Sequence, residues 1–506
     1  MAKIERTKNA SRNIAFGVIL KVYQILVPFM MRTAMIYLMG VQYLGLNSLF
    51  TSVLQVLNLA ELGVGSAMVY SMYKPVAEDD NATICALIKL YRTYYRVIGL
   101  VIAVVGCVLT PFIPHLIKSD VPAGINIYIL YLLNLGATVL SYWLFAYKNS
   151  ILQAHQRNDV VSKVTLVTST VQYGLQLFVL WAFHNYYLYV IVMLATQALT
   201  NIVTAVCANK LYPQFKPKGE VSTEEKKIIT NKIKDLFFIK IGSVVVDSAD
   251  TIVISAFLGL TSLAIYQNYF YIMNSVYGMV GIVFVSITAG VGNSLITESI
   301  EKNYNDLRTF TFLLSGILCF CCTCFIGLYQ PFMKIWVGDS LMLGFPFVIL
   351  ICIYFYVRLI ASIWNVPKDA AGLWHTDRYR ALIAAAVNLA LNLAMVNYIG
   401  LYGILLSTII SVLFISCPWI LHNIFKYVYK QRPWSYLLQI MKYLLCTVVC
   451  CALNHRICTM LNYEGIAGVI IYALISVLIS SLYLIVFCKS QEMKNSIVIV
   501  KKVLRK

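Results

Sequence analysis

The sequence predicts an all-α protein that crosses a membrane about fourteen times. It predicts two six-helix halves that repeat one another, followed by two additional helices. Three observations support this fold class: an apolar composition, a series of helix-length apolar runs, and an internal repeat at a spacing of about 219 residues.

The composition excludes a soluble globular protein of this length. Of the 506 residues, 60% are hydrophobic and only 12% are charged, whereas a soluble domain carries about 25% charged residues. A chain with so little polar surface needs lipid as its solvent. Its fourteen cysteines lie largely inside apolar runs, and their spacing predicts neither a disulfide framework nor a zinc site.

Apolar runs long enough to span a bilayer, about 20 residues each, define the predicted helices. They lie near residues 13–40, 46–70, 93–117, 124–147, 161–184, 187–208, 236–259, 263–295, 309–332, 343–366, 380–399, 402–425, 435–456 and 465–488. The predicted domains are an N-lobe at 1–210, a linker at 211–234, a C-lobe at 235–430 and an appendage with a basic tail at 431–506.

The distribution of Lys and Arg predicts the orientation. With the N-terminus inside, the external loops hold only Lys118, Lys334 and Arg456 of the forty cations. Nearly all the others fall in cytoplasmic loops and tails, which is the positive-inside pattern. We therefore expect both termini in the cytoplasm of a multi-pass protein of the bacterial inner membrane. The net charge of +19 then reflects topology, and no nucleic-acid partner is expected.

Four short matches in the same order indicate the internal repeat. They pair 40–46 with 259–265, 63–66 with 290–293, Pro111-Phe112 with Pro331-Phe332, and His155 with His375. Six spans separate the matched segments, and an even number gives both halves the same orientation. Two such bundles facing one another across a cavity are typical of transporters.

Charged residues within the first predicted span suggest a wet, electropositive cavity. Lys21, Gln24 and Arg32 fall on one helical face, and a charge inside a membrane is costly unless it faces a cavity or a partner. The alternative is that both cations extend to the two interfaces. At the repeat spacing Lys21 corresponds to Lys240, and Arg358 is the cation inside the tenth span. We assign these four cations to substrate binding, with Gln24 beside them.

Acids and amides in other spans are candidates for coupling and for the cavity wall. Glu61, Asp247 and Asp250 could bind a coupling proton or sodium ion, or could balance nearby cations. The alternative is a structural role in helix packing. The amide side chains predicted to line the cavity are Asn47, Gln55, Asn58, Asn268, Asn274, Asn388 and Asn392.

Polar and aromatic walls suit sugars, and fixed cations suit phosphate. The sequence shows no nucleophile elbow, P-loop, zincin motif or sugar-nucleotide motif. It therefore predicts a protein that is not an enzyme, that needs no cofactor other than a coupling ion, and that does not hydrolyse ATP itself.

Four segments resemble bacterial polysaccharide-biosynthesis flippases: 43–50 (YLGLNSLF), 57–63 (LNLAELG), 70–75 (YSMYKP) and 250–255 (DTIVIS). That family belongs to a superfamily with multidrug extruders of the MATE type and the peptidoglycan-precursor flippase. The resemblance covers essentially the whole chain. It implies a MATE-like fold that moves undecaprenyl-pyrophosphate-linked oligosaccharide repeat units, such as those of O-antigen, to the outer leaflet by alternating access.

The resulting hypothesis is a lipid-linked oligosaccharide flippase coupled to protons or sodium. Its expected partners are the lipid-linked glycan, membrane lipids and glycan-assembly proteins. Two alternatives stay open at this point: a cation-coupled multidrug extruder of the same fold, and a membrane glycan polymerase or ligase. Short external loops and missing catalytic motifs count against the enzyme.

Overall fold

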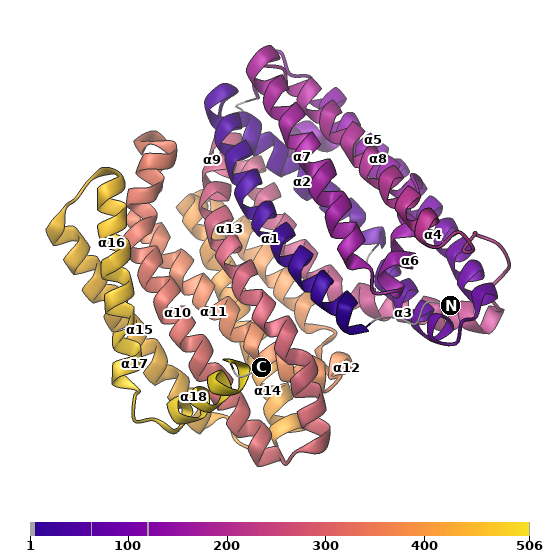
Figure 1. The fold of residues 1–506 in the computed structure, drawn as a ribbon. Helices are drawn as coiled ribbons and strands as arrows, with labels where there is room; N and C mark the ends of the chain where they lie inside the picture. The colour runs from indigo at the N-terminus through magenta and orange to yellow at the C-terminus, as the bar shows by residue number, and fades with distance from the viewer. Residues whose placement is uncertain (1–5, 62, 119–120, 505–506) are drawn as a thin grey trace. The chain divides into compact units, whose positions relative to one another are not determined.

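In the computed structural model, residues 6–61, 63–118 and 121–504 are described, and every regular element among them is helical (Figure 1). The described chain divides into two compact units, residues 1–264 and 265–506. This division falls inside one helix, beyond the predicted linker at 211–234. Which spans belong to each lobe therefore stays a prediction.

The first unit contains the N-terminal helices and the beginning of a very long one. Its elements are α1 (Arg6–Leu38), α2 (Val41–Leu57), a 3₁₀ turn (Asn58–Glu61), α3 (Val64–Ala77), α4 (Asn81–Leu109), a 3₁₀ segment (Thr110–Leu116), α5 (Ile127–Trp143), a 3₁₀ turn (Ala146–Lys148), α6 (Asn149–Ala154), α7 (Asn158–Phe183), α8 (Tyr186–Leu211) and the start of α9 (Thr223–Thr297).

The second unit contains the rest of α9 and all later helices. Its elements are α10 (Ile300–Val337), a 3₁₀ turn (Asp339–Leu341), α11 (Phe345–Ala370), α12 (Trp374–Asp377), α13 (Arg380–Ser411), a π-helical turn (Val412–Ser416), α14 (Cys417–Asn423), a second π-helical segment (Ile424–Tyr429), α15 (Trp434–Leu461), α16 (Gly465–Ser480), α17 (Leu482–Val486) and α18 (Gln491–Leu504).

The structure confirms a polytopic helical protein, but it does not confirm a count of fourteen spans. Ten described segments are long and apolar enough to cross a membrane, or eleven if the bent pair of 127–143 and 146–154 is one crossing. The predicted second span is broken between α2 and α3, and the predicted pairs at 236–295 and 380–425 each form one continuous segment.

The pair at 380–425 nevertheless folds back on itself as two antiparallel segments. Asn388 Nδ2 donates to Thr408 Oγ1 at 2.9 Å, although twenty residues separate them. Twenty residues of straight helix would span about 30 Å, so the chain must fold back between them. It does so at Gly400, whose backbone (φ 57°, ψ −135°) is not helical.

The backbone supports the internal repeat at its first match. Gly40, which precedes α2, has φ 117° and ψ 157°, and Gly259, inside α9, has φ 87° and ψ 173°. Both angles lie in a region that essentially only glycine occupies. The two matched segments therefore begin with the same unusual turn.

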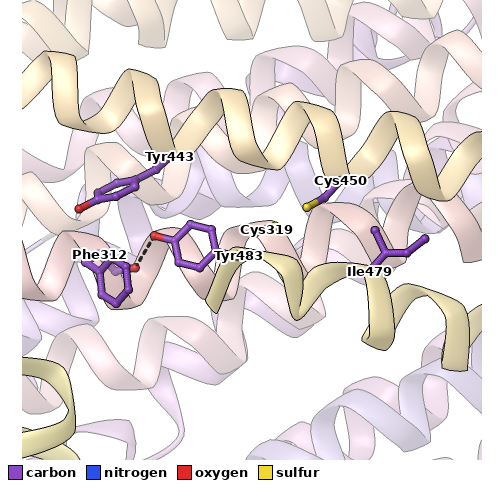
Figure 2. Close-up of a cluster of buried hydrophobic side chains, with 6 residues drawn as sticks. All are labelled: Phe312, Cys319, Tyr443, Cys450, Ile479 and Tyr483. Carbon is purple, nitrogen blue, oxygen red and sulfur yellow. Dashed lines mark hydrogen bonds between the residues drawn. The ribbon is translucent and has the colours of Figure 1, made fainter. Parts of the chain in front are cut away.

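The last helices pack on α10 around a buried aromatic cluster (Figure 2). Phe312 and Cys319 of α10 meet Tyr443 and Cys450 of α15, and the Tyr483 hydroxyl donates to the Phe312 carbonyl at 3.0 Å. Because lipid tails are as apolar as these side chains, close packing and polar contacts must hold such helices together.

One buried amide provides such a polar contact between α10, α15 and α16. Asn454 Nδ2 donates to the Thr323 carbonyl at 2.9 Å and to Ser476 Oγ at 3.1 Å. A Cβ on Gly327 would lie 2.5 Å from this amide nitrogen, so glycine is what allows the approach. All fourteen cysteines are free thiols, and only Cys107 and Cys488 are exposed.

Candidate functional site

A break in the predicted second span positions Glu61. Helix α2 ends at Leu57, a 3₁₀ turn carries the chain to Glu61, and Gly63 takes a left-handed conformation (φ 88°) before α3 begins. The left-handed conformation is accessible mainly to glycine. The break therefore places a carboxylate in the interior of the first unit.

Tyrosines of α4 and α5 contact the two ends of this turn. The Tyr95 hydroxyl donates to Glu61 Oε1 at 3.2 Å, and the Tyr91 hydroxyl donates to that of Tyr95 at 2.6 Å. The Tyr142 hydroxyl donates to Asn58 Oδ1 at 3.2 Å, and its ring meets that of Tyr95 edge-on at 5.3 Å. Glu61 and Asn58 are both site residues predicted from the sequence. The three tyrosines that connect them were not predicted.

Glu61 lines a polar cavity of about 430 Å³ between helices of the first unit. A Cβ on Gly65 would lie 3.1 Å from both Glu61 Oε1 and the Tyr91 hydroxyl, so glycine preserves the space beside the carboxylate. The other polar residues of its wall are Ser66, Asn149, Ser150, Gln153, Thr165, Gln197, Thr200, Asn201 and Thr204. A roomy cavity with many polar partners suits water, and a carboxylate reached by water can exchange a proton or hold a cation.

The second unit contains a fixed guanidinium at Arg358 of α11. Its central carbon lies 4.1 Å from the centroid of the Tyr277 ring and 5.6 Å from that of Tyr354. Nη1 donates to Asn274 Oδ1 at 3.1 Å. Stacking on aromatic faces is a favourable environment for arginine. The structure therefore brings together two predicted site residues, Arg358 and Asn274.

A hydroxyl contact holds the Tyr277 ring in place. The Tyr277 hydroxyl and Ser362 Oγ lie 3.0 Å apart, and Ser362 Oγ also donates to the backbone carbonyl of Arg358 at 2.9 Å. Ser362 lies one turn beyond Arg358 on α11. The same helix therefore carries the arginine and the residue that orients its stacking partner.

The remaining predicted site residues are dispersed. Asn388 and Asn392 are fully buried and bond to each other, to Ser407 and to Thr408 inside the α13 hairpin. These contacts are typical of helix packing, and a role in the cavity wall stays a prediction for both residues.

The other predicted site residues differ in how far their side chains are buried. Lys21, Arg32 and Asn47 are half-buried, Gln24 and Gln55 are exposed, and Asp250 and Asn268 are buried. The side chains of Lys240 and Asp247 lie outside the described residues, so their predicted roles are unchanged.

Solved structures share this fold, whereas no family model and no curated protein sequence matches the chain. The lipid II flippase MurJ in its inward closed conformation superposes with a TM-score of 0.68 at 16% identity, covering 94% of this chain and 99% of MurJ. An inward-facing multidrug resistance MATE family transporter of the MOP superfamily gives 0.59 at 13% identity, covering 80% and 96%. A point mutant of the Vibrio cholerae MATE transporter VcmN gives 0.53 at 13% identity, covering 84% and 99%.

These similarities establish the fold. The chain is a multi-pass membrane protein with the fold of MurJ and the MATE transporters, and the predicted fold class is confirmed. At such low identity the likeness of fold does not carry substrate or mechanism with it.

Proposed function

We propose that the protein is a flippase that moves undecaprenyl-pyrophosphate-linked oligosaccharide repeat units from the inner to the outer leaflet. The observation that carries this proposal is Arg358, held against Tyr277 and bonded to Asn274 in a fold that MurJ shares. A guanidinium in a fixed plane suits the paired oxygens of a pyrophosphate, and aromatic rings beside it suit the apolar faces of sugars.

The half-buried cations Lys21 and Arg32 are proposed as further contacts to the anionic part of the substrate, together with Lys240. A wall bearing fixed cations disfavours organic cations, which argues against the multidrug extruder. Uptake of a cationic dye in cells with and without the protein separates these two functions. A protein-dependent fall in dye accumulation would favour the extruder.

The substrate proposal is tested by surface glycan export in a flippase-deficient host. Arg358→Ala is expected to lower export about ten-fold or more, since a hydrogen bond to a charged group is worth roughly 1.5–3 kcal/mol. Arg358→Lys should restore part of it. Arg456→Ala, which removes an exposed arginine from α15 in the same unit, is the matched control. Normal export by Arg358→Ala at normal membrane levels would contradict the assignment.

The position of accumulated intermediates separates a flippase from a polymerase or ligase. Loss of the flippase leaves lipid-linked units on the inner leaflet. Loss of a polymerase leaves single units exposed outside. Exposed, unpolymerised units in cells lacking this protein would favour the enzyme.

Glu61 is proposed as the group that couples transport to a proton or sodium gradient, with Asp247 and Asp250 as the other candidates. Glu61→Gln keeps an oxygen for the Tyr95 hydroxyl but cannot ionise. In proteoliposomes, transport by this variant should lose its dependence on the imposed gradient while some exchange persists. Tyr95→Phe, which keeps the ring, should retain that dependence. Equal dependence in wild type and Glu61→Gln would exclude Glu61.

A further inference from the structure

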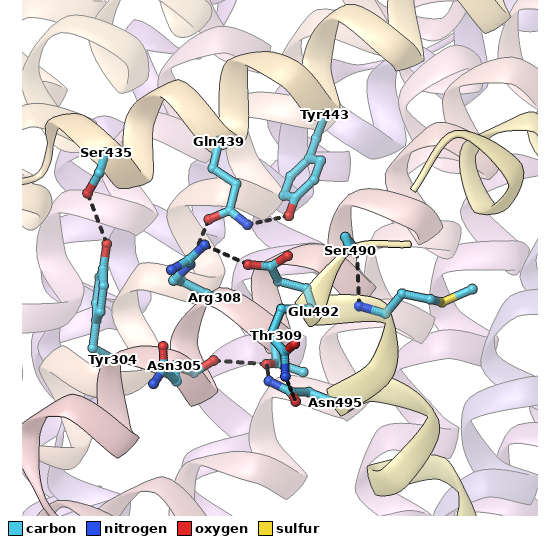
Figure 3. A network of polar contacts seen from close by, with 12 residues as sticks. Tyr304, Asn305, Arg308, Thr309, Ser435, Gln439, Tyr443, Ser490, Glu492 and Asn495 are labelled. Carbon is cyan, nitrogen blue, oxygen red and sulfur yellow. Dashed lines mark hydrogen bonds and ion pairs between the residues drawn. The ribbon is translucent and has the colours of Figure 1, made fainter. Parts of the chain in front are cut away.

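The C-terminal helix α18 is bound to the second unit through one face (Figure 3). Ser490 directly precedes the helix and caps it, with Oγ accepting from the Met493 backbone amide at 3.1 Å. Arg308 Nη2 donates to Glu492 Oε1 at 2.7 Å, and the whole Glu492 residue is only 7% exposed. Asn495 Nδ2 donates to Thr309 Oγ1 at 3.5 Å. The amide-and-acid face of α18 is therefore used in contacts with α10.

A chain of polar contacts extends this attachment to α15. Arg308 Nε donates to Gln439 Oε1 at 2.9 Å, and Gln439 Nε2 donates to the Tyr443 hydroxyl at 2.6 Å. Met493 of α18 packs against the aromatic cluster that contains Tyr443. Because three helices share this network, the contacts determine which face of α18 points outward.

The outward face of α18 combines positive charge with apolar side chains. Lys494 is exposed, and Ile497 and Val498 are 45% and 53% exposed. The chain continues with Lys501 and Lys502, still within the helix, and its last two residues are also basic. Basic residues beside apolar ones are typical of a helix that lies in a membrane interface.

Neighbouring segments at the same end of the unit have a similar surface. Helix α15 begins there, since the Ser435 and Tyr304 hydroxyls lie 3.3 Å apart beside Arg308. Lys430 and Arg432 are exposed in the turn before α15, and Trp434 is 69% exposed. Tryptophan is enriched at the level of lipid headgroups, which indicates that this end of the unit lies at the membrane surface.

We propose that the outward face of α18, with the basic turn before α15, binds the headgroups of anionic lipids. The lysines would contact lipid phosphates, and Ile497 and Val498 would enter the boundary between headgroups and acyl chains. An acidic protein would also be attracted to the positive charge of this surface. It would not account for the two exposed apolar side chains, which lie near the end of a membrane helix. This inference is independent of the proposed substrate and concerns a surface away from Arg358 and Glu61.

The test uses the full-length protein in nanodiscs of phosphatidylcholine with and without phosphatidylglycerol. Hydrogen exchange of the α18 amides is expected to slow when the anionic lipid is present, and added salt should reverse the effect. Native mass spectrometry should show retained phosphatidylglycerol. A variant carrying Lys494→Gln, Lys501→Gln and Lys502→Gln should retain about ten-fold less of it, since each lysine near an anionic surface contributes to binding.

A matched variant removes the same charge elsewhere. Lys216→Gln and Lys218→Gln, in the segment between α8 and α9, and Lys227→Gln, near the start of α9, change three exposed lysines, and they should leave both measurements unchanged. The proposal is overturned if exchange in α18 is the same in both lipids, or if the two variants lose lipid equally. Slowing of exchange by soluble polyglutamate but not by phosphatidylglycerol would assign the surface to an acidic protein, and would also overturn it.

Discussion

Both units have a buried aspartate shortly after the repeat-matched histidine, at the start of α7 in the first unit and at the end of α12 in the second, but they surround it differently. In the first unit Asp159 of α7 lies 2.9 Å from Arg157, 3.5 Å from Lys163 and 3.9 Å from Arg12. In the second unit Asp377 lies 2.7 Å from both Lys368 and Arg380. Arg157 and Asp377 are separated by the same 220 residues as His155 and His375, so a cation in the first half stands where the second half has an acid.

The cations differ in their access to water. The Lys163 and Arg12 side chains are 47% and 35% exposed, whereas that of Lys368 is only 7% exposed. A cation that reaches water loses little when its partner is removed, and a buried one is left uncompensated. Similar clusters in the two halves should therefore differ in their importance for stability.

The largest expected effect is that of Asp377→Asn. It removes the buried acid that Lys368 and Arg380 share, which should cost about 3–5 kcal/mol and lower the melting temperature of the purified protein markedly. Asp369→Asn removes the more exposed acid next to Lys368 and is the control. Equal losses in the two variants would show that burial of Asp377 is unimportant.

The second effect concerns the matched positions Gly45 and Ala264. A Cβ on Gly45 would lie 2.2 Å from the Leu260 carbonyl oxygen, which belongs to backbone that cannot move aside easily. Gly45→Ala should therefore destabilise the first unit by about 2–3 kcal/mol. The reciprocal change Ala264→Gly should cost about 1 kcal/mol. Both are measured by thermal unfolding in detergent, and a stable Gly45→Ala protein would contradict the close approach of these backbones.

Asp159→Asn should have a smaller effect than Asp377→Asn. Its cations can be hydrated once the carboxylate is neutral, so we expect a loss of about 1–2 kcal/mol. The backbone N–H of residue 159 would still donate to Asn13 Oδ1, a bond of 2.8 Å in the wild type that connects α7 to α1. If this variant melts as low as Asp377→Asn, exposure of the cations does not explain the difference between the two clusters.

The smallest effect is a pH dependence at His155. Its ring packs on Tyr212 at 4.3 Å, and its Nδ1–H donates to the Ile151 carbonyl. Burial lowers its pKa, although this hydrogen bond and, to a smaller extent, Asp79 oppose the shift. A lowered pKa means that the unfolded chain binds the proton more readily. The stabilisation is therefore complete above the unfolded pKa of about 6.5 and is lost as the pH falls below it.

Thermal unfolding of wild type and His155→Gln between neutral and mildly acidic pH measures this contribution. Wild type should lose stability on acidification more steeply than the variant. His375→Gln, which changes the exposed histidine at the matched position of the second half, should follow wild type. Parallel curves for all three proteins would exclude His155 as the source.

The sequence was sufficient to predict the fold class, because composition and apolar runs depend only on local chemistry. It also predicted the Gly40 and Gly259 match, and it selected Arg358 and Asn274, which proved to be in contact. An ionisable or amide side chain inside an apolar run stands out without any knowledge of its neighbours.

Partners across the bundle could not be predicted in the same way. Tyr95 and Glu61 are 34 residues apart, and nothing in the sequence pairs them, since tyrosines are common throughout this chain. The i and i+4 spacing of Tyr91 and Tyr95 was the available signal. Asp159, Asp377 and Glu492 lie near the ends of apolar runs, where charged residues are expected at the membrane surface, so their burial was not anticipated.

The two exposed thiols differ in their expected access to water, and this difference can be used to test the membrane orientation of the C-terminus. Cys107 lies in the apolar stretch of α4, where lipid would cover it, whereas Cys488 is the last residue of the last predicted span and is followed by Lys489. A membrane-impermeant maleimide should therefore react with Cys488 from one side of a sealed vesicle only. Labelling in inside-out but not right-side-out vesicles would place the C-terminus in the cytoplasm without any engineered cysteine.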